Sequence, residues 1–188
     1  MKLTDQFLRK INYLRVSVTD RCDLRCVYCM KEKMQFLPKK EILTLEEIER
    51  LCDNFIQLGV EKIRLTGGEP LVRKDILHLI ENLNKKKSFT NLKEITLTTN
   101  GSLLKKFAKD LKKNGIDRIN VSLDTIIKEK YKEITRFGNL DNVLDGIDEA
   151  IKHNIKIKIN TVVFKNFNEN QVVDLIKWSN KKLLDLTF

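Results

Sequence analysis

Three cysteines lie close together near the N-terminus, at Cys22, Cys26 and Cys29. Three residues separate the first pair and two separate the second, so three thiols share one short loop. A closed structural metal site normally takes four protein ligands, whereas three ligands leave one position open for chemistry. Thiolates also bind iron–sulfur clusters, with one cysteine for each iron. Three cysteines on a four-iron cluster would therefore leave one iron open to a small molecule.

The other candidate ligands of the chain do not complete a zinc site. Zinc would need a fourth ligand. Cys52 has the helical spacing of a core residue, and neither His78 nor His153 is spaced as a partner of the three cysteines. We therefore favour an iron–sulfur cluster. A zinc site, or a non-catalytic metal-binding module, stays open as the alternative.

The composition indicates a single globular domain. The chain has 188 residues, of which 41% are hydrophobic and 33% are charged, so it can bury a sizeable core. Its apolar runs are too short to span a membrane, and its first residues lack the apolar stretch of a signal peptide. We therefore expect a cytoplasmic protein, where thiols stay reduced and clustered cysteines indicate metal binding or catalysis.

The net charge of +10 has three interpretations: nucleic-acid binding, solvated lysine-rich helices, or an anionic small substrate. The lysine runs 85–87, 112–113 and 181–182 fall at expected helix ends, where the helix dipole favours cations. Basic and aromatic residues do not interleave as they do in a nucleic-acid platform. We therefore favour charged helix faces, and we expect no nucleic-acid or membrane partner. An anionic substrate would need only a few cations in one pocket.

Hydrophobic periodicity predicts alternating strands and helices. Apolar Leu14, Val16 and Val18 alternate with polar residues as in a strand, and Thr44 with Glu47 forms a capping box before a helix. The strands are expected at 13–19, 60–66, 94–98, 118–123, 155–164 and 183–188. The helices are expected at about 45–58, 76–84, 103–114, 140–153 and 168–180.

This alternation predicts an α/β fold with a parallel sheet and right-handed crossovers. Six units are fewer than the eight of a complete TIM barrel, so we expect a partial (βα)6 TIM-like barrel. Polar residues recur where strands end, at 66–69, 98–100 and 122–124, and the cysteine loop follows the first strand. The carboxyl ends of parallel strands are where such sheets place their sites. We therefore expect the site at that end of the sheet.

Two further features of the sequence have a structural and a functional interpretation. Gly67-Gly68-Glu69-Pro70 follows a strand, and a double glycine permits close backbone approach. It is either a simple tight turn or a seat for an amino group, with Glu69 or a backbone carbonyl as the acceptor. Tyr28 either packs against the cysteine loop or stacks on a ligand.

Three cations lie within expected strands, on the side opposite the apolar residues: Arg15, Arg64 and Lys158. In a barrel that side can be the interior, and a buried cation needs a partner such as a phosphate. The alternative is an exposed strand face or ion pairs with nearby acidic residues. Periodicity alone favours this alternative.

The cysteine spacing with an aromatic residue before Cys29, together with the Gly67–Pro70 turn, resembles the radical S-adenosylmethionine superfamily. Within it, the likeness is closest to the GTP 3′,8-cyclase family and covers nearly the whole chain. The matching segments are 14–22, 28–30, 63–71 with Arg73 and Asp75, 97–101, 119–124 and 134–150.

The resemblance implies a cofactor, a substrate and a reaction. Cys22, Cys26 and Cys29 would hold a [4Fe-4S] cluster whose open iron binds S-adenosylmethionine, and an electron donor would drive its cleavage to a 5′-deoxyadenosyl radical. This lyase would convert GTP to (8S)-3′,8-cyclo-7,8-dihydroguanosine 5′-triphosphate, the first step of molybdenum cofactor biosynthesis. The implied S-adenosylmethionine contacts are Tyr28, Gly68 and Ser122. The implied GTP contacts are Arg15, Arg64, Thr98 and Lys158, which reverses the preference drawn from periodicity. No catalytic side chain is implied.

The chain departs from the family pattern at a few points. Lys31 stands where the family has proline, and the family's second three-cysteine cluster and terminal double glycine do not occur. The sequence stops in or just after the sixth strand, without a helix to cover it. We therefore expect residues 1–188 to be an incomplete radical S-adenosylmethionine core domain, lacking a C-terminal second-cluster domain and full cyclase turnover. Another radical enzyme that modifies a peptide or cofactor is the alternative, and a homodimer is left open.

Overall fold

Six parallel strands form one sheet in the same order as in the sequence, and each strand pairs with the next along the chain. The computed structural model describes residues 3–188. The strands are β1 (Tyr13–Ser17), β2 (Lys62–Thr66), β3 (Glu94–Thr99), β4 (Arg118–Ser122), β5 (Lys156–Asn160) and β6 (Asp185–Thr187). This sheet confirms the expected α/β fold and is consistent with a partial barrel.

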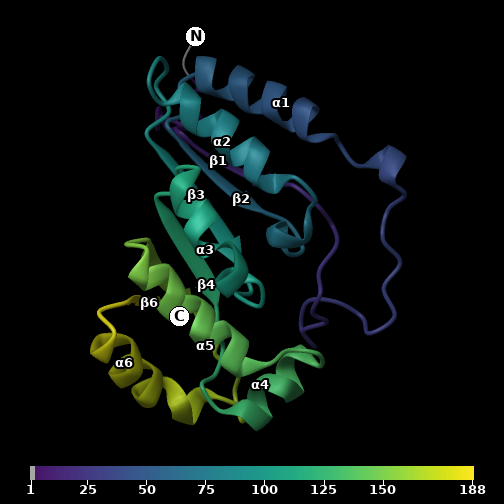
Figure 1. The fold of residues 1–188 in the computed structure, drawn as a ribbon, viewed down its shortest axis with the longest axis vertical. Coiled ribbons are helices and arrows are strands. Elements are labelled where there is room, and N and C mark those ends of the chain that lie inside the picture. Colours follow the sequence, from purple (N-terminus) through teal and green to yellow (C-terminus); the bar gives the residue numbers. More distant parts are fainter. Residues whose placement is uncertain (1–2) are drawn as a thin grey trace.

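Helices connect the strands and cover one face of the sheet, in front of it in Figure 1. The α-helices are α1 (Leu45–Gln57), α2 (Ile76–Lys86), α3 (Leu104–Lys113), α4 (Lys128–Thr135), α5 (Leu140–Lys152) and α6 (Val172–Lys181). Three short 3-10 helices are η1 (Lys39–Glu41), η2 (Pro70–Val72) and η3 (Glu169–Gln171). A long connection between β1 and α1 loops away from the sheet beside α4 (Figure 1).

The two faces of the sheet differ in chemistry because side chains alternate along each strand. One set is apolar and packs into the core beneath the helices: Leu14, Val16, Ile63, Leu65, Ile95, Leu97, Ile119, Val121, Ile157, Ile159 and Leu186. Full burial of each aliphatic side chain contributes about 1.5–3 kcal/mol. The opposite set is polar, so the hydrophobic core lies against one face of the sheet.

The helix ends follow their sequence signals. The Thr44 hydroxyl accepts from the Glu47 amide at 3.2 Å, and the Glu47 carboxylate accepts from the Thr44 amide at 2.8 Å, which confirms the capping box of α1. Gly59, with a φ of +102°, reverses the chain after α1 in a conformation that glycine adopts without a steric penalty. Cys52 is fully buried in α1, as its spacing predicted.

One helix was not expected from the sequence. α4 follows β4 and has only three buried side chains, Tyr131, Ile134 and Thr135. Its other residues are charged or exposed, so its two turns give too short an apolar pattern to recognise. This helix lies beside the cysteine loop and helps to hold it.

The last two units are shorter than expected. β5 ends at Asn160 rather than near 164, because the chain then turns and Thr161 donates its hydroxyl to the Leu123 carbonyl at 2.7 Å. The buried Asn168 amide donates to the Val162 and Asp124 carbonyls at 2.9 and 2.7 Å. These bonds satisfy backbone groups of the turn, and α6 begins only after them.

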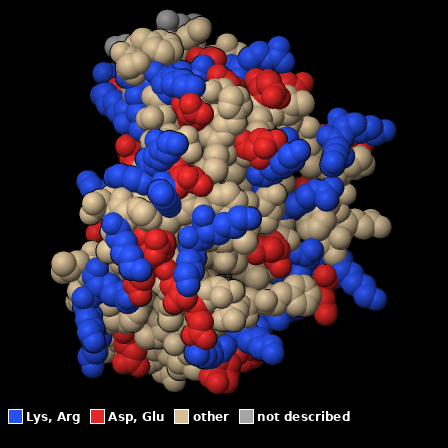
Figure 2. Space-filling model, in the orientation of Figure 1, with Lys and Arg blue, Asp and Glu red and all other residues tan. Residues whose placement is uncertain are grey.

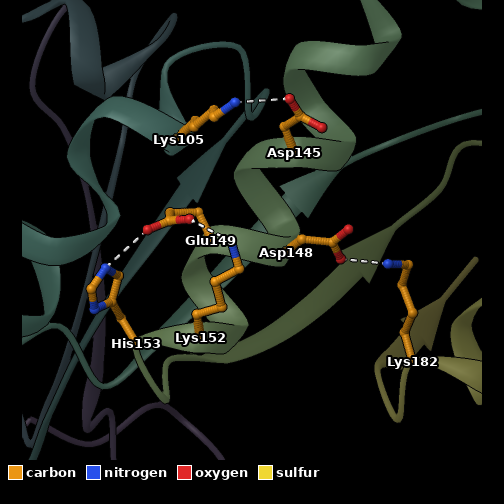
Figure 3. A network of polar contacts seen from close by, with 7 residues as sticks. All are labelled: Lys105, Asp145, Asp148, Glu149, Lys152, His153 and Lys182. Carbon is orange, nitrogen blue, oxygen red and sulfur yellow. Dashed lines mark hydrogen bonds and ion pairs between the residues drawn. The ribbon is translucent and has the colours of Figure 1, made fainter.

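Ion pairs join α5 to its neighbours, as Figure 3 shows. Lys105 on α3 meets Asp145 at 3.0 Å, and Lys182, just after α6, meets Asp148. Glu149 faces Lys152 and the His153 ring at the end of its helix. Such exposed pairs contribute less than about 1 kcal/mol each, so they orient the helices more than they stabilise them.

Lysines and arginines are spread over the face shown in Figure 2, with acidic residues among them. We expect such a mixed distribution when the charged residues lie on the exposed faces of helices. Within residues 3–188, none of the helices is long and apolar enough to cross a membrane.

Candidate functional site

The cysteine loop and the glycine turn meet where β1 and β2 end. The Gly68 amide donates to the Thr19 carbonyl at 2.8 Å, and the Glu69 amide donates to the Arg21 carbonyl at 2.8 Å. A Cβ atom on Gly68 would lie 2.2 Å from the Arg21 carbonyl oxygen, and one on Gly67 would lie 2.5 Å from that of Thr19. The double glycine is therefore needed for two loops to approach through their backbones.

The far side of the cysteine loop is held by the end of α4. The Arg25 and Val27 amides donate to the carbonyls of Thr135 and Ile134 at 3.2 and 2.9 Å. The Arg136 guanidinium donates to the Arg25 carbonyl at 2.8 Å and to the Met30 carbonyl at 3.1 Å. Arg136 has a φ of +62°, a strained conformation for a side chain of its size. Its contacts with the cysteine loop compensate for that strain.

The three thiols are free and lie on the same loop. Cys22 and Cys26 are half-buried, Cys29 is exposed, and the Cys29 amide closes a turn by donating to the Cys26 carbonyl at 2.9 Å. Burial is the main reason why the pKa of the Cys26 thiol is raised to about 12, and the neighbouring Cys22 and Asp124 contribute to the rise. Burial also raises the pKa of Cys22. These thiols must lose their protons when they bind iron.

The donor set fits an iron–sulfur cluster. Cys22, Cys26 and Cys29 supply three uncommitted thiols from one loop, and each would bind a different iron. Over residues 3–188, no three His, Cys, Asp or Glu side chains converge on one point as ligands of a single metal ion would, whereas a cluster needs each thiol to reach a different iron. The loop lies at the carboxyl end of β1, as the sequence predicted.

Tyr28 lies between the loop and the end of β4. Its hydroxyl donates to the Asp124 carboxylate at 2.7 Å, and its ring lies 5.0 Å from that of Phe164. Burial raises the pKa of Asp124, and the Tyr28 hydrogen bond opposes that rise. Tyr28 remains 45% exposed, so one part of its ring is open to a ligand. Ser122, at the end of β4, is half-buried.

Glu69 is committed to the protein itself. Its carboxylate is fully buried and accepts from the Leu71 amide at 3.0 Å, the Thr99 hydroxyl at 2.8 Å and the Asn100 amide at 2.7 Å. Burial raises its pKa to about 7 in spite of these donors. Glu69 therefore joins the ends of β2 and β3, and its carboxylate is not free to accept from a ligand amino group.

The predicted GTP contacts share the polar face of the sheet. Arg15 on β1 pairs in register with Arg64 on β2. Thr98 on β3 and Lys158 on β5 lie in another row across the sheet, in which both pair in register with Asn120 on β4. The Thr98 hydroxyl has no hydrogen-bond partner among the described residues. Arg64 lies 5.2 Å from the centre of the Tyr13 ring.

Sequence reasoning missed three more polar residues in these rows. Arg118 on β4 pairs in register with Lys156 on β5, so a second pair of like charges lies side by side. The Asn120 amide accepts from Arg64 at 3.1 Å once its oxygen is turned toward the guanidinium. The signal that could have found them is strand alternation, but strand register had to be known as well.

Some charges of the polar face are neutralised within it. Lys62 meets Glu94 at 2.6 Å, and Arg118 lies 3.8 Å from the same carboxylate. Arg15, Arg64 and Lys158 make no ion pair with any residue from 3 to 188. The polar face of the sheet therefore carries three cations without an ion-pair partner among residues 3–188.

This fold and loop define a class of protein. The family model of the Radical SAM superfamily matches residues 16–179, so the chain belongs to that superfamily. Proteins of this superfamily take a [4Fe-4S] cluster and S-adenosylmethionine as cofactors. The chain is 57% identical over 185 residues to the GTP 3′,8-cyclases of Brucella ovis and Brucella canis. These matches cover 98% of the chain and 54% of each relative, so the chain spans about half of their length.

Solved structures share the fold at lower identity. Streptococcus suis SuiB bound to precursor peptide SuiA matches with a TM-score of 0.77 and 23% identity, over 93% of this chain and 38% of that one. Native anSMEcpe with bound AdoMet and Kp18Cys peptide matches with a TM-score of 0.71 and 23% identity, over 93% and 49%. These likenesses concern the fold alone.

Proposed function

We propose that the protein is the radical-forming part of a GTP 3′,8-cyclase, a lyase that converts GTP to (8S)-3′,8-cyclo-7,8-dihydroguanosine 5′-triphosphate in the first step of molybdenum cofactor biosynthesis. The 57% identity to GTP 3′,8-cyclases over almost the whole chain supports this assignment. Residues 1–188 are then its core domain, and its four free cysteines fit a reducing cytoplasm.

The site residues divide by role. Cys22, Cys26 and Cys29 hold the cluster. When bound, the cluster and S-adenosylmethionine together supply a 5′-deoxyadenosyl radical, for which a one-electron donor is required. Tyr28, Ser122 and the backbone of Gly68 contact S-adenosylmethionine.

The substrate contacts come from the open face of the sheet. Arg15, Arg64 and Lys158 bind the phosphates of GTP, and the Thr98 hydroxyl donates to the substrate. Their part is to bind and orient GTP, because a radical abstracts a hydrogen only from an atom held close to it.

One observation carries the proposal: like charges face each other across neighbouring strands. Arg15 on β1 pairs in register with Arg64 on β2, and neither makes an ion pair with a residue from 3 to 188. Adjacent strands are only about 4.8 Å apart, and like charges at such distances repel. A triphosphate is an anion that several cations can neutralise at once, and arginine binds phosphate through two parallel hydrogen bonds.

GTP binding tests the substrate assignment. We expect Arg64→Ala and Lys158→Ala each to weaken GTP binding about 10- to 100-fold, because a hydrogen bond to a charged group contributes about 1.5–3 kcal/mol. Lys105→Ala is the matched control, since Lys105 lies on α3 in an exposed ion pair with Asp145. Equal affinities in all three variants would contradict the phosphate assignment.

Product analysis separates the alternative functions. A longer chain, in which residues 1–188 are continued by the part of a GTP 3′,8-cyclase that they do not span, is reconstituted with iron and sulfide without oxygen, reduced, and mixed with S-adenosylmethionine and GTP. Cyclised GTP together with 5′-deoxyadenosine is the expected result. 5′-Deoxyadenosine without cyclised GTP would assign another radical reaction, on a peptide or cofactor. Bound zinc without sulfide would instead assign a metal-binding module.

A further inference from the structure

Asn100 directs its side-chain amide at the first cysteine of the loop. It follows β3 directly, and its Nδ2 atom lies 3.7 Å from Cys22 Sγ and 2.8 Å from Asp23 Oδ1. An amide nitrogen carries two hydrogens, so it can donate to both groups. The Asn100 Oδ1 atom accepts from the Ser102 amide at 2.9 Å. The Ser102 backbone amide can only donate, so it must face the Asn100 oxygen. The NH2 group of Asn100 is therefore the end that faces the Cys22 thiol.

The position of this amide is fixed on both sides. The Asn100 backbone amide donates to the buried Glu69 carboxylate at 2.7 Å. On the other side, Asp23 is held by the Ser102 hydroxyl, which donates to Oδ2 at 2.6 Å. The turn after β3 and the start of the cysteine loop are therefore joined by a closed set of hydrogen bonds.

Hydrogen bonding distinguishes Cys22 from the other two cysteines. Its sulfur accepts from the Leu24 amide at 3.4 Å in addition to Asn100. Among the described residues, the sulfurs of Cys26 and Cys29 accept no hydrogen bond from another residue. The three thiols are thus chemically unequal, and part of the difference comes from a residue 78 positions away in the sequence.

We propose that Asn100 is a positioning residue that orients Cys22 and raises the reduction potential of the cluster through its N–H to sulfur hydrogen bond. Hydrogen bonds to the sulfurs are one of the determinants of cluster potential. Reduction adds an electron, which makes the thiolate sulfur a stronger acceptor, so a donor at Cys22 favours the reduced state. This inference rests on the assignment of Cys22 as a cluster ligand in the proposed function.

The test compares Asn100→Ala with Ser102→Ala in the reconstituted protein. The first removes the donor to Cys22, whereas the second removes only the hydroxyl that holds Asp23. Iron and sulfide content are measured first, and then the midpoint potential is determined by a redox titration followed by the EPR signal of the reduced cluster. We expect Asn100→Ala to lower the equilibrium constant for reduction of the cluster about tenfold, which lowers the midpoint potential by about 59 mV for one electron. Ser102→Ala should stay close to the unsubstituted protein.

Each outcome decides the question. Equal potentials in Asn100→Ala and the unsubstituted protein overturn the inference, and so does an equal shift in both variants. If Asn100→Ala is folded by circular dichroism but holds no cluster while Ser102→Ala holds one, orientation of Cys22 by Asn100 is supported. Loss of the cluster in both variants overturns it, because Asp23 would then be the cause. Failure of the unsubstituted protein to bind iron and sulfide would instead refute the proposed function.

Discussion

The buried carboxyl of Glu69 makes stability depend on pH in a way that can be isolated. Burial raises its pKa from 4.5 to about 7, although the Leu71 and Asn100 amides and the Thr99 hydroxyl donate to it. An unfolded chain releases this proton near pH 4.5, whereas the folded protein retains it until about pH 7. The folded state therefore binds more protons between these values, and stability falls as the pH rises through this window.

The size of the effect follows from the difference in pKa. One pKa unit corresponds to about 1.4 kcal/mol, so Glu69 contributes a loss of about 3 kcal/mol in the free energy of unfolding between pH 4.5 and 7. Glu69→Gln removes the titration but keeps the shape of the side chain. At pH 5 this substitution should lower the free energy of unfolding by about 1–3 kcal/mol, because the glutamine NH2 group cannot accept a hydrogen bond from the donor that it faces. By pH 8 that cost should shrink by about 3 kcal/mol.

Urea unfolding between pH 4.5 and 8 measures this difference. The control is Glu129→Gln, a substitution of the same kind at an exposed position on α4. Subtracting the Glu69→Gln curve removes the contributions of all other titrating groups. If the curves of Glu69→Gln and the unsubstituted protein stay parallel from pH 4.5 to 8, the reasoning is refuted, because Glu69 would then titrate alike in both states.

Three other substitutions test the packing around the site. Gly68→Ala places a Cβ atom 2.2 Å from the Arg21 carbonyl oxygen, so we expect the free energy of unfolding in urea to fall by about 1–3 kcal/mol. An unchanged unfolding midpoint would contradict the close approach of the two loops. Leu97→Ala removes a fully buried side chain and should cost about 2–5 kcal/mol in the same measurement; a loss below 1 kcal/mol would show that the core collapses around it. Tyr28→Phe removes the hydroxyl that donates to Asp124, so the pKa of the Asp124 carboxyl should rise further. NMR titration measures this pKa, and an unchanged value would mean that the Tyr28 hydrogen bond does not affect it.

Periodicity and turn residues were enough to predict the main elements of the fold. The alternation in 13–19 located β1, and Thr44 with Glu47 located the start of α1. The polar residues after β2 and β3 correctly indicated the end of the sheet at which the loops gather. These signals are local, because they depend on side chains within one or two turns of each other.

The contacts that hold the site could not be predicted in the same way. Arg136 reaches carbonyls more than 100 positions earlier in the chain, and Asn100 reaches Cys22 across 78 positions. Such contacts depend on the register of six strands and on α4, whose mostly charged sequence conceals it. The paired cations Arg118 and Lys156 were missed for the same reason, since nothing within either strand indicates its partner.

The division of the sheet into an apolar and a polar face also bears on how such proteins diversify. Along each strand, the side chains that pack against the helices alternate with those that face the open side. No position of a strand therefore serves both faces. Replacing Arg15, Arg64 or Lys158 changes what the open side attracts and leaves the apolar layer untouched. The charge of the open side can therefore change through a few mutations that remove no side chain from the apolar layer.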